Sequence, residues 1–507
     1  MKAKIRKMLA RRKRKIQRRL ARKARQSPTP VFQGVPHYDI AERCRATPAG
    51  GIGLAQALVK RIGLAEAIDS RLHLLKVHLP YHESDHVLNI AYNALSGGTC
   101  LEDIELRRND EAFLDALGAD RIPDPTTEGD FCRRFAEDHV LELQYAYDDA
   151  RRFVWKEQPD EFFEEAIIDM DGTLVTSTGQ CKEGMDFSYK GDWCYHPLLV
   201  SLANTSEPLR IINREGNRPS HEGAWAAADD AIELCKNAGF RKFLLRGDTD
   251  FTQTEHLDRW SDDNVRFVFG IDAMPNLRAI AEDLPENAWK RLTRREPPPP
   301  KTAPRQRPDN VKEQVVVARG FEKLRLVGET IAEVVYRPGK CNRDYRLVIV
   351  HKRIEATRGG ELIEGVHDRY LFYITNDHAI AAEEIVYLAN SRCNQENLIE
   401  QLKNGVSALA APVDNLVSNW AYMVMASLAW CLKAWMALSL PEQPGRWQEQ
   451  HRQQKRDVLT MEFKQFVNYF ILLPAQVVRT GRRLILRLLT WNRWQHCFFR
   501  LCDALRC

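Results

Sequence analysis

Three segments of the chain carry carboxylates in settings suited to metal binding. The segment IIDMDGT places Asp169 and Asp171 at the end of an apolar run, and LLRGDTDF places Asp248 directly after another. Positions i and i+2 of a strand face the same side, so both aspartates of the first segment can point into one site. The third segment, RCNQENLIEQLKNG, places Glu396 on a predicted helix.

The predicted helix also carries two cations. Arg392, Glu396 and Lys403 stand at i, i+4 and i+11, which a regular helix places on one face. Strand-end aspartates and a helical glutamate supply the hard oxygen ligands that hold two Mg²⁺ ions about 3.5–4 Å apart. Such ions activate water or a 3′-hydroxyl, while Arg and Lys bind DNA phosphates. The three segments together therefore predict a two-metal phosphoryl-transfer site.

Each motif alone also has an ordinary structural explanation. Aspartates that follow strands are common turn residues. A helix with Arg, Glu and Lys at this spacing is often a solvated, salt-bridged face. Along the chain, the strand-end aspartates come first, a β-rich segment follows, and the helical glutamate comes last. This order is more restrictive than any one motif, and it favours the catalytic interpretation.

Two other functions compete with this interpretation. DMDGTL is also typical of haloacid-dehalogenase-like phosphatases, in which the first Asp, here Asp169, is the nucleophile. GDTD resembles the Mg²⁺ motif of those enzymes, but Asp250 comes too early, and neither Lys236 nor Lys242 has a distinctive setting. That alternative also leaves about 250 C-terminal residues unexplained. The second alternative is a silent relic, that is, a protein that still binds DNA but has lost its catalytic activity.

The elements that must position these residues follow from the apolar pattern. Five strands are predicted in EEAIIDMDGTLV, HPLLVSLAN, PLRIINREG, KFLLRGDTDF and NVRFVFGID, with the amphipathic helix HEGAWAAADDAIELCKNAG between the third and fourth. Gly239 is the predicted end of that helix. The segments VKEQVVVARG, TIAEVVYRPG and YRLVIVHKRI alternate like strands, and a long helix is predicted from Ala379 to Asn404. The fold class is therefore a multi-domain α/β protein.

The charge distribution points to a polyanionic partner. Residues 1–26 contain fourteen Lys or Arg and no acid, so the rest of this chain of net charge +5 carries −9. We expect a mobile arm that orders on the phosphate backbone of double-stranded DNA. Its candidate contacts are Arg11, Arg12, Lys13 and Arg14; a merely solubilising run is the alternative. Residues 52–155 are predicted to be mostly helical, either as a DNA-contacting helix-turn-helix or as a packing module.

The composition excludes several classes of protein. With 44% hydrophobic and 28% charged residues, the chain is an ordinary globular protein rather than a disordered, collagenous or membrane-filling one. Twelve scattered cysteines without a CxxC pair indicate a reducing, cytoplasmic compartment. The apolar stretch from Leu416 to Leu440 is interrupted by Asn419 and Lys433, so a buried core helix is predicted and no membrane contact is expected.

Composition shifts along the chain predict six regions. They are a basic arm and linker (1–35), a helical DNA-binding region (36–155), the first part of the catalytic core (156–284), a Pro-rich spacer and β-rich insertion (285–375), the second part of the core with the helical Glu (376–440), and a basic helical C-terminal region (441–507).

Taken together, the motifs resemble those of bacterial insertion-sequence DDE transposases, in particular the insertion-sequence 1380 family. The resemblance rests on LSGGTCLEDIELRRND, IPDPTTEGDFCRRF, IDMDGT, YHPLLV, REGNRPSHEGA, LLRGDTDF and YLFYITN, and on the R-(x3)-E-(x6)-K spacing. It implies a ribonuclease-H-like catalytic core interrupted by a β-rich insertion. It also implies Mg²⁺-dependent cutting at terminal inverted repeats, with Mn²⁺ as a substitute, strand transfer into target DNA, and a homodimer on paired ends in the bacterial nucleoid.

The resemblance assigns Asp171, Asp248 and Glu396 as the catalytic metal ligands, with Arg392 and Lys403 as DNA ligands. Asp171 is preferred to Asp169 because the first motif of the group places its Asp before a small residue and Thr, as in Asp171-Gly172-Thr173.

One position departs from the pattern of the group. The signature tyrosine falls at Ala389, and Tyr387 is the nearest tyrosine. The resemblance therefore leaves the excision route open, a hairpin intermediate included.

Overall fold

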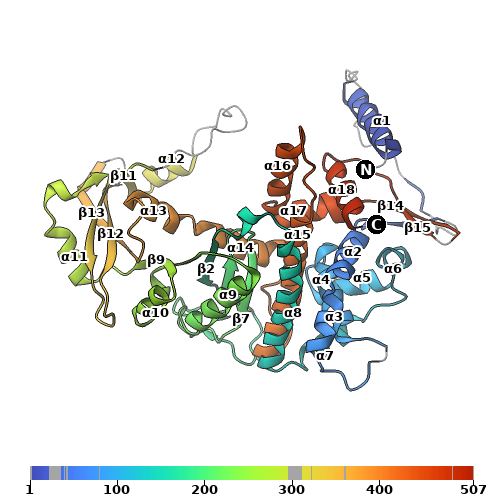
Figure 1. Ribbon diagram of the computed structural model, residues 1–507, viewed down its shortest axis with the longest axis horizontal. Coiled ribbons are helices and arrows are strands. Elements are labelled where there is room, and N and C mark those ends of the chain that lie inside the picture. Colours follow the sequence, from blue (N-terminus) through green and yellow to red (C-terminus); the bar gives the residue numbers. More distant parts are fainter. Residues whose placement is uncertain are drawn as a thin grey trace.

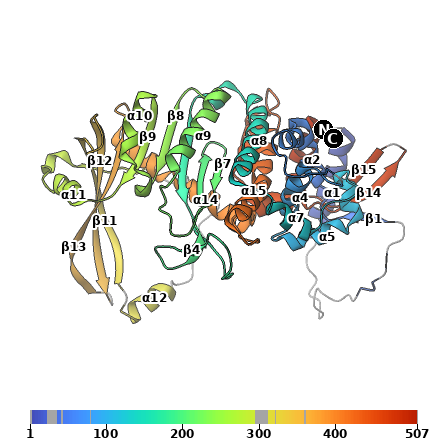
Figure 2. The ribbon, with the colours of Figure 1, turned by 90° about the horizontal axis from the view of Figure 1, so that it is seen from below.

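The structure is a computed structural model, and it describes residues 3–21, 36–38, 40, 44–78, 80–294, 311–320, 322–358, 361–481 and 483–505. Two parts of the sequence, residues 22–35 of the predicted basic arm and linker and the four prolines at 297–300, lie outside the described residues. Helical regions from the two ends of the chain lie side by side, and the β-rich insertion lies at the opposite end of the molecule (Figures 1 and 2).

A nine-stranded mixed sheet forms the centre of the molecule, in the order β10-β11-β12-β13-β9-β8-β2-β6-β7. Its strands are β2 (Ala166–Gly172), β6 (Leu198–Leu202), β7 (Glu207–Ile212), β8 (Phe243–Gly247), β9 (Val265–Ile271), β10 (Lys290–Arg291), β11 (Glu322–Tyr336), β12 (Tyr345–Arg358) and β13 (Glu361–Thr375). Strands β2, β8 and β9 are parallel, whereas β6, β7 and β13 run antiparallel to their neighbours. The carboxyl ends of the three parallel strands therefore meet at one edge.

The predicted strands of the first α/β region all form. Every residue of β6 and β8 is buried, as expected of continuous apolar runs in a covered sheet. Helix α9 (Ala224–Ala238) covers this sheet and ends at Gly239, whose φ of 102° is left-handed, as the sequence predicts. Shorter elements border the sheet: β3 (Val175–Thr176), β4 (Asp186–Phe187), β5 (Trp193–Tyr195), α10 (Leu257–Asp262) and α11 (Pro275–Glu282).

Two predictions about the region from 311 to 404 are wrong. The segment VKEQVVVARG forms helix α12 (Val311–Ala318) rather than a strand, because it pairs with no described strand and satisfies its backbone locally. The long helix before and after Glu396 is broken into α13 (Ala382–Asn390), α14 (Cys393–Glu400) and a π-helical turn, η6 (Gln401–Gly405). The break at Ser391 and Arg392 gives α14 a direction of its own.

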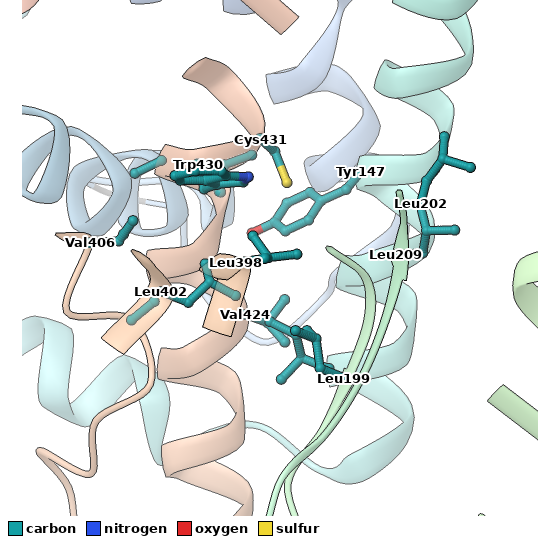
Figure 3. Packing of buried hydrophobic residues seen from close by; sticks show 14 of the residues in the cluster. Tyr147, Leu199, Leu202, Leu209, Leu398, Leu402, Val406, Val424, Trp430 and Cys431 are labelled. Atoms are coloured by element: carbon teal, nitrogen blue, oxygen red, sulfur yellow. The ribbon is translucent and has the colours of Figure 1, made fainter. Parts of the chain in front are cut away.

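Helix α14 is fixed by apolar packing. Its Leu398, with Leu402 of the following turn, belongs to the buried cluster that includes Val424 of α15 (Leu416–Leu438) and Leu199 of β6 (Figure 3). Helix α15 is long and apolar enough to cross a membrane, but its most apolar window is completely buried in the protein. The prediction of a buried core helix is confirmed.

Lys433 is buried in α15 without a carboxylate partner among the described residues. It is 0% exposed; its Nζ donates to the carbonyl of Leu459 at 2.6 Å and lies 4.0 Å from the ring centroid of Trp430. Burial lowers the pKa of Lys433 to about 7, and this outweighs the attraction of the ring for the charged form.

We expect Lys433→Met to raise stability more at pH 7 than at pH 9. Between pH about 7 and the ordinary pKa of 10.5, the unfolded chain binds the proton that the folded chain excludes, so wild-type stability rises with pH. Methionine removes that dependence, and the gain should differ by about 2 kcal/mol between the two pH values. Urea unfolding at both pH values measures it; an equal shift at both would contradict the assignment.

The N-terminal region is helical, as predicted. It consists of α2 (Ile52–Ile62), α3 (Leu64–Arg71), α4 (Glu83–Leu95), α5 (Ile104–Arg108), α6 (Glu111–Leu117), α7 (Pro125–Cys132) and α8 (Glu137–Lys156). The C-terminal region contains α16 (Gln448–Leu459), α17 (Phe463–Phe466) and α18 (Gln495–Leu505).

The C-terminal region is not helical throughout. Strands β14 (Ala475–Thr480) and β15 (Arg483–Leu488) form a hairpin, and β1 (Arg45–Thr47) adds a third strand to it. Gly481, with φ of 55°, supplies the left-handed turn position. The β-branched residues Val477, Val478 and Ile485 favour strands over helices.

The described part of the basic arm forms a helix, which the sequence analysis did not predict. Residues Ala3–Leu20 form helix α1, in which Ile5, Leu9, Arg12 and Ile16 make a half-buried face. Arg12 Nη1 donates to the carbonyls of Leu488 and Thr490 at 2.9 Å each. These contacts attach the arm to the C-terminal hairpin (Figure 1). Like-charge repulsion is therefore offset by a helix face that the sequence analysis overlooked.

Candidate active site

Two of the predicted aspartates meet at the carboxyl edge of the sheet. Asp171 lies at the end of β2, and Asp248 follows β8, the parallel neighbour of β2. The guanidinium of Arg392 lies between them: Nη1 is 3.0 Å from Asp171 Oδ2, and Nη2 is 3.5 Å from Asp248 Oδ2. The fold thus joins three residues that the sequence analysis selected from separate motifs.

The other two residues of the predicted helical motif lie nearby. Glu396 is exposed in the first turn of α14 and lines the same cleft as Asp248 and Arg392. Lys403 Nζ donates to the carbonyl of Leu174, just beyond β2, at 2.7 Å. Burial lowers the pKa of Lys403, against the opposing effect of Glu400 and then Asp171. Lys403 therefore contributes positive charge beside Asp171.

Burial disfavours the charged form of both carboxylates, and the nearby cations only partly offset this effect. Burial raises the pKa of Asp171 to about 6, against the effect of Arg392, and the charge of Asp248 adds to the rise. Burial likewise raises the pKa of Asp248, again against Arg392, with Asp250 and Asp272 adding to the rise. Adding a cation at this position would therefore stabilise both ionised carboxylates.

Asp169 has a different environment from Asp171. It is 1% exposed, and it forms a bidentate ion pair with Arg246 of β8, with Nε–Oδ1 at 2.6 Å and Nη2–Oδ2 at 2.7 Å. Arg246 Nη1 also donates to the carbonyl of Leu388 on α13 at 3.1 Å. A phosphate ester cannot reach this carboxylate. The phosphatase alternative, which needs Asp169 as a nucleophile, is therefore incompatible with the structure.

An open cleft of about 950 Å³ contains Asp248, Arg392 and Glu396. Its walls come from the ends of β8 and β9, from α11, from β13 of the insertion and from the α13–α14 segment. The sequence analysis missed two cations that line it, Arg278 and Arg369. It also missed Asp272, which follows β9 as Asp248 follows β8; strand-end carboxylates on neighbouring parallel strands are the signal that would have found it.

The donor set suits a hard divalent cation. Asp171 and Asp248 offer carboxylate oxygens toward one position, where the cationic group is now the Arg392 guanidinium. In the described part of the chain, no cluster of three or more His, Cys, Asp or Glu is close enough together to hold an ion. Glu396 shares the cleft and extends the donor set, but it is not part of the aspartate pair in this conformation.

The structure also places the remaining residues of interest. Ala389, at the position of the signature tyrosine, lines the cleft, whereas Tyr387 is 41% exposed and is not part of its lining. Arg11, Lys13 and Arg14 are exposed on α1, away from the carboxylates, beside α18 and the C-terminal hairpin (Figures 1 and 2). The arm and the carboxylates therefore belong to two separate surfaces.

Comparison with known proteins identifies the family. Residues 44–507 match the family model described as "Transposase DDE domain group 1". Among solved structures, the chain is similar to a piggyBac transposase in a synaptic complex with hairpin DNA, with 9% identity, a TM-score of 0.37 and coverage of 84% of each chain. No curated protein matches the chain. Since the family model spans nearly the whole sequence, the chain belongs to the group 1 family of DDE-domain transposases and is a DNA transposase.

Proposed function

We propose that this transposase cuts double-stranded DNA at the terminal inverted repeats of an insertion sequence of the 1380 type and transfers the freed strand into target DNA. The observation that carries the proposal is the convergence of Asp171 and Asp248 on Arg392, with Glu396 on the same cleft. The chemistry is phosphoryl transfer, in which positioning and electrostatic stabilisation supply most of the catalysis.

A ribonuclease-H-like core is part of this proposal. Support comes from the sheet segment β7-β6-β2-β8-β9, in which the first aspartate lies on the central strand and the second follows its parallel neighbour. The strands β10–β13 intervene between β9 and the helix that carries Glu396. This is the order that the resemblance implies: strand aspartate, strand aspartate, β-rich insertion, helical glutamate.

DDE transposases generally use divalent metal ions. We assign Asp171, Asp248 and Glu396 as the residues that would hold two Mg²⁺ ions, or Mn²⁺ ions. When bound, such ions neutralise charge on the phosphate and lower the pKa of an attacking water or hydroxyl.

Arg392 is the residue that must change partners during the reaction. Its guanidinium is engaged by the two aspartates, so binding of divalent cations there would release it toward a DNA phosphate. Lys403 adds a second cation at the same edge. Water then attacks the phosphodiester in line, and the freed 3′-hydroxyl attacks target DNA in a second displacement. Pairing of two element ends requires two protomers, and we propose a homodimer on DNA.

The test is cleavage of a labelled duplex that carries the flanks of the gene, in Mg²⁺, in Mn²⁺ and in EDTA. We expect metal-dependent cuts at a discrete flanking position, and a loss on the order of 10³-fold in Glu396→Gln, equal to several kcal/mol of transition-state stabilisation. Glu400→Gln is the matched control, because Glu400 is one turn further along α14 and bonds only the Asn404 side chain, at 2.8 Å, among the described contacts.

Three outcomes separate the candidate functions. Equal cleavage by the wild type and Glu396→Gln would show that Glu396 is not a catalytic residue. Binding of the flanking duplex without cleavage by either protein would favour the silent relic. Hydrolysis of a small phosphate ester without DNA binding would overturn the proposal.

A further inference from the structure

A cationic pocket lies far from the carboxylate cleft. A pocket of about 260 Å³ opens between helices α1, α16 and α18, and it is lined by Arg6, Arg446, Trp447, His451, His496 and Arg500 together with glutamines. It shares no residue with the cleft of Asp248 and Glu396. No carboxylate lines it. The pocket therefore offers concentrated positive charge without an internal counter-ion.

Arg500 at the base of the pocket is buried and incompletely bonded. It is 7% exposed, and its Nη1 donates to Gln454 Oε1 at 2.8 Å. Its Nε and Nη2 have no hydrogen-bond partner among the described residues. Leaving two donors of a buried cation unpaired is costly. Both nitrogens are buried, although Arg500 lines the pocket, so an acceptor in the pocket reaches them only when the side chain turns toward it.

No acid of the described chain supplies that acceptor. Burial lowers the pKa of Arg500, and Glu442 is the one carboxylate whose charge opposes the effect. Glu442 instead contacts Arg452 at 3.4 Å and Lys455 at 3.8 Å. Two N–H groups of the Arg500 guanidinium therefore have no anionic partner among the described residues. Two parallel N–H donors of an arginine are the geometry that binds phosphate oxygens.

The pocket is pre-organised by hydrogen bonds. Gln454 uses both ends of its amide: Oε1 accepts from Arg500, and Nε2 lies 3.0 Å from His496 Nε2. His451 Nδ1 accepts from the backbone N–H of Gln443 at 3.1 Å. At the rim, the exposed Arg446 lies over the ring of Trp447, 4.9 Å from its centroid. The base is held in place while the rim is open to a large ligand.

We propose that this pocket binds a backbone phosphate of DNA, with Arg500 at its base and Arg446 and Arg6 at its rim. The inference rests on the proposed function insofar as DNA is the substrate. Duplex DNA is favoured over a free anion because Arg6 comes from α1, whose exposed Arg11, Lys13 and Arg14 continue the positive surface outward from the pocket. The arm and the C-terminal region would then grip one duplex together.

The test measures binding of the flanking duplex over a series of salt concentrations, with Arg446→Gln and Arg500→Met. Each variant should weaken binding by about 5- to 20-fold and reduce the slope of log affinity against log salt by about 1, as loss of one phosphate contact requires. Arg456→Gln is the matched control: Arg456 is exposed on α16, which borders the pocket, but it bonds Glu449 at 3.0 Å and does not line the pocket.

A second experiment identifies the source of the phosphate. Thermal unfolding in inorganic phosphate, compared with chloride at equal ionic strength, should show stabilisation of the wild type that both pocket variants lose. If phosphate stabilises the wild type but the variants bind DNA as well as the wild type does, the pocket takes a free anion and the DNA proposal is wrong. Arg446 is exposed, so its variant keeps the test valid if Arg500→Met does not fold.

The outcomes also distinguish this inference from the proposed function. If both variants keep the affinity and the salt slope of the wild type, and the wild type still cuts DNA, the proposal for the pocket is wrong. The proposal for the carboxylate site is then unaffected. If both variants bind DNA more weakly but the wild type does not cut it, the proposed reaction is wrong. The proposal that the pocket binds DNA is then supported.

Discussion

Asp171→Asn and Asp248→Asn are each expected to reduce DNA cleavage on the order of 10³-fold or more, the largest effect on activity in this protein. Each substitution keeps the shape of the side chain but removes one of the two charges that converge on Arg392. The site would then lose the hard anionic donors that hold a divalent cation. Cleavage of the flanking duplex in single-turnover conditions measures the loss.

Asp169→Asn provides the comparison, since it changes the same residue type two positions earlier on the same strand. Asp169 is bonded to Arg246 in the core, so we expect its loss to lower the unfolding temperature by leaving a buried cation unpaired. The shift in unfolding temperature caused by added Mg²⁺ should persist in Asp169→Asn and disappear in Asp171→Asn. The reverse pattern would show that the two aspartates have been assigned the wrong roles.

The largest effect on stability is expected from a buried charge network under the sheet. Asp148 of α8 bonds Arg151 at 2.7 Å and Arg210 of β7 at 2.7 Å, and Arg210 also bonds Asp230 of α9 at 2.5 Å. Glu207 of β7 lies 3.6 Å from Arg151. Helix α15 joins the same network, because the indole N–H of Trp435 donates to Glu207 at 2.7 Å. The network therefore ties three helices to one edge of the sheet.

Asp148→Ala should destabilise the protein by about 3–5 kcal/mol, because it leaves two buried guanidinium groups without their shared carboxylate. The midpoint of urea unfolding, followed by circular dichroism, measures this. Asp149→Ala is the control: Asp149 is the next residue, but it pairs with Arg71 and Arg152 at the surface, so its loss should cost at most about 1 kcal/mol. Similar midpoints for the two variants would mean that the buried network is not a source of stability.

Much of the local structure could be predicted from the sequence. Apolar periodicity and turn residues predict helix α9 with its stop at Gly239, the buried helix α15, and the five strands β2, β6, β7, β8 and β9. These features depend on neighbours within a few residues, so a single sequence contains the necessary information. The spacing of Arg392, Glu396 and Lys403 was likewise sufficient to select the helix that reaches the cleft.

Elements whose conformation depends on a distant partner were predicted less well. The C-terminal hairpin is stabilised by pairing with β1, which is more than 400 residues earlier in the chain. Helix α1 is held by carbonyls near residue 490. Periodicity within either segment contains no information about these partners.

The sequence by itself determined the chemistry of this protein: which carboxylates follow strands, which helix carries the glutamate, and which family the motifs resemble. Only the tertiary structure decided which aspartate lies beside Asp248. Asp169 and Asp171 have the same strand setting, but Arg246, 77 residues later, neutralises the first, whereas Arg392, 221 residues later, lies between the second and Asp248. The energy of a charge depends on its distance from other charges and from water, and the folded chain alone fixes those distances.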